Sequence, residues 1–126
     1  MYELTIELDF EAAHQLRGYE GPCARLHGHN YRLEITVAGE RLDQRGLLRD
    51  FRELSAACRQ VLAPLDHQLL NDIPPFDELN PSSEHLARVM FQQLSEALND
   101  EVLQVRQVRL WETPTASVTY RAEGDE

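Results

Sequence analysis

Apolar and polar residues alternate strictly over the first part of the chain. One parity is apolar and carries Tyr2, Leu4, Ile6, Leu8, Phe10, Ala12 and His14, and the other carries Glu3, Thr5, Glu7, Asp9 and Glu11. A period of two over this length predicts a half-buried β-strand over residues 2–14. The core face of this strand ends in a histidine.

A second strand repeats the pattern in mirror order. Its apolar parity carries His27, His29, Tyr31, Leu33, Ile35 and Val37, so this core face begins with histidines. If the two strands pair as a hairpin, His14 lies near His27 and His29. The intervening residues 15–26 are too many for a tight turn, and long ordered loops are more often functional than idle.

Two amphipathic helices are predicted next. Asp50 and Glu53 are placed like a capping box at the first helix, and Asn80-Pro81 opens the second. The residues expected to face inward are Leu47, Leu48, Phe51, Leu54, Cys58, Val61 and Leu62 in the first helix, and Leu86, Val89, Met90, Leu94, Ala97 and Leu98 in the second.

The chain closes with two further strands. Val108, Leu110 and Glu112 share a face in one, and residues 116–122 alternate in the other. The order ββααββ predicts an α+β domain, spanning residues 1–126, in which two helices lie on one face of an antiparallel sheet. Four strands leave two sheet edges open, so we expect a ring-like homo-oligomer.

Composition narrows the class of protein. The chain has 126 residues, 42% of them hydrophobic and 27% charged, and a net charge of −10. It has twelve arginines and no lysine. An acidic balance argues against a nucleic-acid partner, whereas a few local arginines still suit a small phosphate or carboxylate.

The sequence also indicates the cellular compartment of the protein. No apolar run approaches the length of a membrane span, and the N-terminal residues do not resemble a signal peptide. Two cysteines provide no disulfide framework. We therefore expect a cytoplasmic protein without a membrane partner.

The three histidines of the hairpin form the strongest chemical signal. An H-x-H pair on a strand places both imidazoles on one side, although His14 alone would be read as a core histidine. Three neutral nitrogens are the ligand set of a catalytic zinc with an open fourth position. Cys23 is the one potential fourth ligand nearby in sequence, so a closed structural Cys-His₃ site is the competing interpretation.

The two cysteines differ in context. Cys23 precedes His27 by four residues in a loop that also holds Arg25. A thiol near a cation and an arginine is suited to proton abstraction or nucleophilic attack, and the alternative is an incidental thiol. Cys58 falls on the inward face of the first helix and is interpreted as packing.

Three further residues are candidates. Asp66 and His67 follow a helix-ending proline, where they form either a proton relay or an ordinary surface turn. Glu112 continues the apolar parity of its strand and therefore points towards the core or a pocket. A buried carboxylate needs a partner, and a ligand with two N–H donors would supply one.

Five segments together resemble, in order, the conserved blocks of the 6-pyruvoyl-tetrahydropterin synthase family. They are Phe10-Glu11-Ala12-Ala13-His14, Cys23-Ala24-Arg25-Leu26-His27-Gly28-His29-Asn30, Leu65-Asp66-His67, Asn80-Pro81-Ser82-Ser83-Glu84 and Trp111-Glu112-Thr113. The resemblance implies a tunnelling fold (T-fold), in which ββααββ subunits form trimers and two trimers stack into a hexamer. It also implies a pocket between subunits, to which one subunit supplies Glu112 for another's metal.

The short spacing from Cys23 to His27, with Arg25 between them, is most like the bacterial branch called 6-carboxy-5,6,7,8-tetrahydropterin synthase. That branch converts 7,8-dihydroneopterin triphosphate, with loss of triphosphate and acetaldehyde, in queuosine (7-deazaguanine) synthesis. The alternatives are a 6-pyruvoyl-tetrahydropterin synthase, which only eliminates triphosphate, and a non-catalytic pterin- or metal-binding module.

The resemblance also implies a role for each candidate residue. Zn²⁺ on His14, His27 and His29 would act as a Lewis acid on the substrate's side-chain oxygens. Cys23 would be the general base, Asp66 and His67 would relay protons, and Glu112 would anchor the pterin ring. Arg25 is the nearest candidate in sequence to meet the triphosphate.

Overall fold

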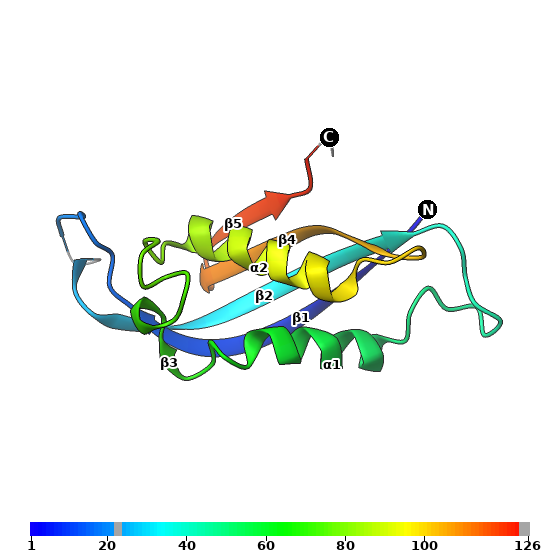
Figure 1. The fold of residues 1–126 in the computed structure, drawn as a ribbon, viewed down its shortest axis with the longest axis horizontal. Helices are drawn as coiled ribbons and strands as arrows, with labels where there is room; N and C mark the ends of the chain where they lie inside the picture. The colour runs from blue at the N-terminus through cyan, green and yellow to red at the C-terminus, as the bar shows by residue number, and fades with distance from the viewer. Residues whose placement is uncertain (22–23, 124–126) are drawn as a thin grey trace.

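The computed structural model describes residues 1–21 and 24–123, which form a five-stranded sheet with two helices against one of its faces (Figure 1). The elements in chain order are β1 (Tyr2–His14), β2 (His27–Gly39), α1 (Phe51–Leu62), β3 (Gln68–Leu69), the 3₁₀ helix η2 (Leu70–Asp72), α2 (Ser83–Leu98), β4 (Gln104–Thr113) and β5 (Ala116–Arg121). The strands lie in the order β3-β1-β2-β4-β5. The four predicted strands and two predicted helices are confirmed, in a mixed α+β arrangement.

The long hairpin of β1 and β2 positions the histidines. The two strands pair antiparallel without a register shift, from Tyr2 opposite Gly39 to His14 opposite His27. His29 is opposite Ala12 and therefore lies on the same face as His14. The predicted meeting of the three histidines at the end of the hairpin is confirmed.

The two faces of the sheet differ in character. The apolar parities of β1, β2 and β4 are buried and form the core with both helices; α1 packs on β1, and α2 packs on β4 and β5 (Figure 1). The opposite parity of β1 and β2 is polar, and in the described part of the chain neither helix covers it. We call these the covered face and the open face.

The strand β3 was not predicted, and it adds one short parallel pairing to the predicted antiparallel sheet. Gln68 and Leu69 pair parallel with Ala12 and Ala13 of β1. Two residues are too few to show a period, so no sequence pattern marks them. The backbone N–H of the preceding His67, which has a φ of 60°, donates to a carbonyl of β1.

The predicted cap at Asp50 is confirmed, whereas the second helix begins at Ser83, after the predicted Asn80-Pro81, and is capped by Ser82. The Asp50 carboxylate accepts the N–H of Arg52 at α1, and the Ser82 hydroxyl accepts the N–H of His85 at α2. Within residues 1–21 and 24–123, neither helix is long and apolar enough to cross a membrane.

Most of the helix residues that were predicted to face inward are buried in the structure. Leu54, Cys58 and Leu62 of α1 are buried. Three expectations are wrong, because Leu47 is 37% exposed, Phe51 is 55% exposed and Ala97 is also exposed. Phe51 is the first residue of α1, so it lies where the helix has only begun to pack on the sheet.

Candidate functional site

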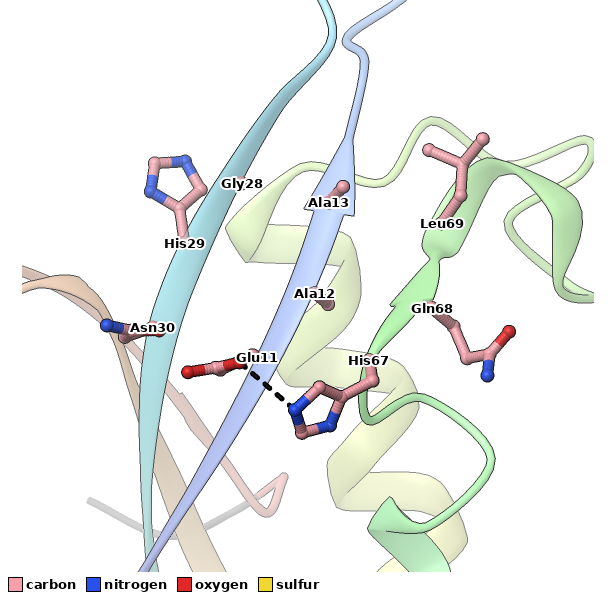
Figure 2. A pocket seen from close by; sticks show the side chains of 9 residues that line it. All are labelled: Glu11, Ala12, Ala13, Gly28, His29, Asn30, His67, Gln68 and Leu69. Carbon is pink, nitrogen blue, oxygen red and sulfur yellow. Dashed lines mark ion pairs between the residues drawn. The ribbon is translucent and has the colours of Figure 1, made fainter.

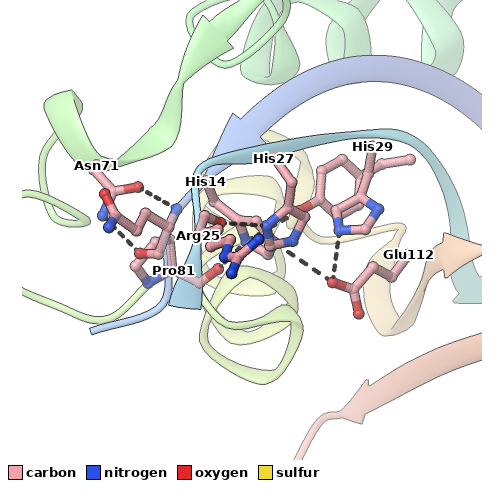
Figure 3. Close-up of polar contacts among 9 residues, drawn as sticks. His14, Arg25, His27, His29, Asn71, Pro81 and Glu112 are labelled. Carbon is pink, nitrogen blue, oxygen red and sulfur yellow. Dashed lines mark hydrogen bonds and ion pairs between the residues drawn. The ribbon is translucent and has the colours of Figure 1, made fainter. Parts of the chain in front are cut away.

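Four side chains with metal-binding atoms converge where β1 ends and β2 begins. They are His14, His27 and His29 of the hairpin and Glu112 at the end of β4 (Figure 3). One ligand atom from each residue lies within 4.8 Å of the ligand atoms of the other three. We call this group the histidine cluster.

Strand geometry brings Glu112 to the histidines. β4 pairs with β2 as far as Trp111 opposite Arg32, and the register of β4 with β5 shifts between Trp111 and Thr113. Glu112 occupies this irregularity. A bulge in a strand commonly re-aims a side chain beside a functional site, and here it directs a carboxylate to the end of the hairpin.

The hydrogen bonds of His14 and His27 fix which ring nitrogen faces the cluster. Nδ1 of His14 lies 2.7 Å from the carbonyl oxygen of Pro81, and Nδ1 of His27 lies 2.6 Å from that of Arg25. A carbonyl oxygen only accepts, so each Nδ1 is the protonated donor. In the neutral rings Nε2 therefore carries a lone pair, and the two Nε2 atoms lie only 2.9 Å apart.

His29 and Glu112, the other two members of the histidine cluster, add further electron-pair donors for a cation. Oε1 of Glu112 lies 3.0 Å from Nε2 of His29 and 3.5 Å from Nε2 of His14. Nε2 of His29 is buried and makes no hydrogen bond among the described residues, so its contact with Glu112 lacks hydrogen-bond geometry. Several electron pairs thus face one small volume, an arrangement that a positive charge at its centre would stabilise.

Protonation of the histidines is not expected to supply that positive charge. Burial lowers the pKa of His14 and of His29, and it outweighs the opposing influence of the Glu112 carboxylate. The neighbouring histidines lower both pKa values further. A divalent cation would satisfy all four acceptors at once, and three imidazoles with a carboxylate suit zinc and related metals.

The chain that follows His14 is held by a double clamp. The side-chain amide of Asn71 bonds both backbone groups of Gln15, each at 2.9 Å, and the amide of Asn80 bonds both backbone groups of Arg17 at 2.8 and 3.2 Å. These bonds anchor the start of the loop that leads to Cys23. They also fix the segment whose Pro81 carbonyl orients His14.

A second polar cluster surrounds His67. Nδ1 of His67 lies 2.9 Å from Asp66 Oδ1, and Nε2 lies 3.1 Å from Glu11 Oε2. Asp66 Oδ1 also accepts the backbone N–H of Glu11 at 3.0 Å, and this bond is the main reason that the pKa of Asp66 is lowered. We call Glu11, Asp66 and His67 the relay cluster.

The relay cluster lies beside a cavity of about 530 Å³ that Glu11 and His67 line together with residues of β2 and β3 (Figure 2). The His67 side chain is 71% exposed. Glu11 is opposite Asn30, which places both on the open face. His29 of the histidine cluster also lines this cavity, but its ring lies on the other side of β2 from His67 in Figure 2.

The structure therefore joins the predicted site residues in two groups. His14, His27, His29 and Glu112 lie together on the covered face, whereas Asp66 and His67 lie on the open face. Cys23 lies outside the described residues. The side chain of Arg25 is exposed, and its observed contact with the cluster is the bond from His27 to its carbonyl oxygen.

Other expectations can be compared with the structure directly. Glu112 points into a pocket-like cluster, as its parity predicted, but it lies beside the histidines of its own chain. The expectation that it reaches the metal of another subunit is therefore corrected. Cys58 is fully buried, and burial raises its pKa to about 11, which agrees with a packing role.

Sequence reasoning missed three contributors to the site. Glu11 flanks His67, Pro81 orients His14, and Asn80 clamps the loop. Pro81 acts through a backbone carbonyl, which no side-chain pattern can reveal. Glu11 was visible only as one of several acidic residues on the polar parity of β1.

Comparisons with known proteins agree with this geometry. The model of the family described as 6-pyruvoyl tetrahydropterin synthase matches residues 3–123. A protein of Haemophilus influenzae named 6-carboxy-5,6,7,8-tetrahydropterin synthase is 30% identical, and the match covers 96% of this chain and 99% of that protein. A Synechocystis protein of the same name is 38% identical, with coverage of 95% and 93%.

Solved structures extend the comparison to the fold. The structure of Caenorhabditis elegans 6-pyruvoyl tetrahydropterin synthase superimposes with a TM-score of 0.82 at 29% identity, over 98% of each chain. A Plasmodium vivax protein of the same name matches with a TM-score of 0.74 at 22% identity. The arrangement of strands and helices in this chain is thus that of the T-fold proteins of this kind.

Proposed function

The chain belongs to the 6-pyruvoyl tetrahydropterin synthase family, and from that premise we propose that it is a zinc-dependent 6-carboxy-5,6,7,8-tetrahydropterin synthase. Its substrate would be 7,8-dihydroneopterin triphosphate, and its by-products would be triphosphate and acetaldehyde. The product would enter queuosine biosynthesis in the cytoplasm.

One observation carries this proposal above the others. Three imidazoles and a carboxylate converge on one point where two Nε2 lone pairs face each other at 2.9 Å. A site with this donor set is suited to a divalent metal, and the relatives that match over nearly the whole chain are named 6-carboxy-5,6,7,8-tetrahydropterin synthases. The fold, the donor set and the relatives point to one chemistry.

His14, His27 and His29 would hold the zinc, and the zinc would supply Lewis acidity to the substrate's side-chain oxygens. The Pro81 and Arg25 carbonyls keep His14 and His27 in the tautomer that presents Nε2. Cys23 would remove a proton from the substrate side chain. Its loop begins at the segment that Asn71 and Asn80 clamp.

The relay cluster would serve a second copy of the chain. Asp66 and His67 lie on the open face, whereas the histidine cluster of the same chain lies on the covered face. A relay needs hydrogen-bond reach to the reacting atoms. His67 would reach them if the open face of one copy meets the histidine cluster of another, which is consistent with a homo-oligomer and with the expected hexamer of two stacked trimers.

The remaining substrate contacts follow from charge. The Glu112 carboxylate would accept the two N–H groups at the edge of the pterin ring. Arg25 is exposed beside the cluster and would meet the triphosphate. An overall charge of −10 makes such local cations more important for an anionic substrate.

A second candidate function is 6-pyruvoyl-tetrahydropterin synthesis, in which triphosphate is eliminated and the side chain is kept. The structural match to the Caenorhabditis elegans protein of that name favours it. Both reactions begin from the same substrate and need the same metal, so the product distinguishes them.

Product analysis tests the proposal. The purified, zinc-loaded protein should convert 7,8-dihydroneopterin triphosphate to a 6-carboxy pterin and acetaldehyde, measured by mass spectrometry and an aldehyde trap. A 6-pyruvoyl product without acetaldehyde would support the second candidate. Binding of the substrate without any turnover would indicate a non-catalytic pterin-binding module and would reject both.

A further inference from the structure

We propose that Glu112 is an exchangeable fourth ligand, which binds the metal while the site is free of substrate and leaves it to bind the pterin ring. This inference rests on the proposed function for the identity of the second partner. It differs from a site of three histidines with an open position, because the resting site would be closed by the protein's own carboxylate.

The distances within the histidine cluster support the first part of the inference, that Glu112 binds the metal. Glu112 Oε1 lies 3.0 Å from Nε2 of His29 and 3.5 Å from Nε2 of His14. Such separations are those of neighbouring ligands around one cation whose bonds are each about 2.0–2.2 Å long. Within residues 1–21 and 24–123, His29 Nε2 makes no hydrogen bond, so the Glu112 carboxylate is not placed there as its acceptor.

The negative charge of the Glu112 carboxylate also indicates that Glu112 binds the metal. In the neutral tautomers fixed by Pro81 and Arg25, the Nε2 atoms of His14 and His27 cannot donate to a carboxylate. A carboxylate facing these nitrogens without a cation would be unfavourable. Glu112 therefore belongs at this position when a metal is bound between it and the histidines.

The position of Glu112 in β4 supports the second part of the inference, that Glu112 leaves the metal to bind the pterin ring. It lies at the irregularity between Trp111 and Thr113, where the regular pairing of β4 is interrupted. Its side chain is 31% exposed, whereas that of His14 is 1% exposed. The carboxylate thus stands at the accessible side of the cluster, and a small local change can turn it from the histidines towards an entering ligand.

The two partners of Glu112 exclude each other. A carboxylate that accepts both N–H groups of a pterin edge directs both of its oxygens at the ring, and in this orientation it is turned away from the metal. Substrate binding would therefore open the coordination position in the same event that anchors the ring. Glu112 would couple recognition of the pterin to the release of that position.

Cobalt substitution tests the inference without relying on activity. The metal-free protein is titrated with Co²⁺, and the visible absorption of the ion reports its ligands while a competing chelator gives its affinity. Glu112→Gln should weaken Co²⁺ binding by at least about tenfold, because even outer partners of a metal site contribute that much. It should also change the absorption spectrum of the bound ion.

Two further variants make the result specific. Glu112→Asp keeps a shorter carboxylate and should lie between the wild type and Glu112→Gln. Glu7→Gln removes an exposed carboxylate from the open face of the same sheet and should match the wild type. Equal melting temperatures of all the metal-free proteins would exclude a general folding defect.

The exchange itself is tested with neopterin, a pterin without phosphates. Neopterin should change the spectrum of the wild-type cobalt protein towards that of Glu112→Gln and should change that of the variant much less. Identical affinity and spectra of Glu112→Gln and the wild type would overturn the inference. Turnover of 7,8-dihydroneopterin triphosphate by the wild type would then still stand as separate support for the proposed function.

Discussion

Two histidine-containing clusters lie on opposite faces of the same strand, and they satisfy their polar groups in different ways. His14 and Glu11 are three residues apart in β1, so the pleat directs them to opposite sides. His14 is completely buried in the histidine cluster, whereas the His67 side chain of the relay cluster is 71% exposed.

The difference indicates what each cluster lacks. In the histidine cluster the acceptors outnumber the donors, and burial lowers the pKa values of His14 and His29, so a bound cation would satisfy the cluster better than protonation. In the relay cluster both ring nitrogens of His67 face a carboxylate, and solvent reaches the group. In the proposed homo-oligomer, a surface of another copy of the chain would enclose that cluster.

The largest expected effect comes from removing a metal ligand. His27→Ala should lower both the zinc content and the turnover, because it removes one of the three imidazoles that would hold the metal. Metal analysis and the rate are measured on the same sample. Full zinc content in this variant would contradict the assignment of the histidine cluster as the metal site.

Cys23→Ala should reduce turnover by about 10²–10⁴-fold, the usual effect of losing a general base, and should keep its zinc. The variant distinguishes a Cys23 that acts as a general base from a Cys23 that is a permanent zinc ligand. If Cys23 were a permanent ligand, zinc would be lost together with the activity.

The pKa shifts predict how the histidine cluster responds to acid. Burial holds the pKa values of His14 and His29 below 6.5, so both rings stay neutral in the fold at a pH where the unfolded chain already binds protons. The stability that depends on them is complete above pH 6.5 and is lost as the pH falls through the lowered values.

Two measurements test this predicted loss of stability at low pH. The melting temperature of the metal-free protein should fall on acidification below pH 6.5, and His29→Ala should weaken that dependence. Zinc should be released at a pH below 6.5, since protons compete only once these rings accept them. A release midpoint above 6.5 would show that burial does not control the cluster.

The smallest expected effect concerns the clamp between the two regions. Asn80→Ala removes two hydrogen bonds to Arg17 and should destabilise the fold by about 1 kcal/mol. Asn99→Ala is a matched control, because its side chain accepts the N–H of Val105 away from the clusters. Both variants should lose stability, and only Asn80→Ala should weaken zinc binding, through the Pro81 carbonyl.

The sequence predicted the histidine cluster because strand pleat and hairpin pairing are local and regular. The parity of β1 and β2 placed the three histidines on one face. The parity of β4 directed Glu112 towards the core or a pocket, but did not place it beside the histidines of its own chain. The start of α1 was predictable from Asp50, because a cap acts within one helical turn, whereas the start of α2 was predicted at Asn80-Pro81 and lies at Ser83.

The relay cluster could not be assigned to a face from the sequence. Its place depends on the parallel pairing of Gln68 and Leu69 with β1, and two residues have no recognisable period. The contact of Glu11 with His67 joins residues far apart in the chain. Phe51 was assigned to the core for a related reason, since helical spacing alone cannot tell which turn packs against the sheet.

The central claim is that the two clusters of different copies act on one substrate, and co-expression of two inactive chains tests it most directly. His27→Ala retains the relay cluster, His67→Ala retains the metal site, and each chain alone should be inactive or nearly so. In oligomers that mix the two chains at random, about a quarter of the sites between copies should combine an intact metal site with an intact relay. The account predicts recovery of about a quarter of the wild-type rate, and mixed oligomers no more active than either variant alone would contradict it.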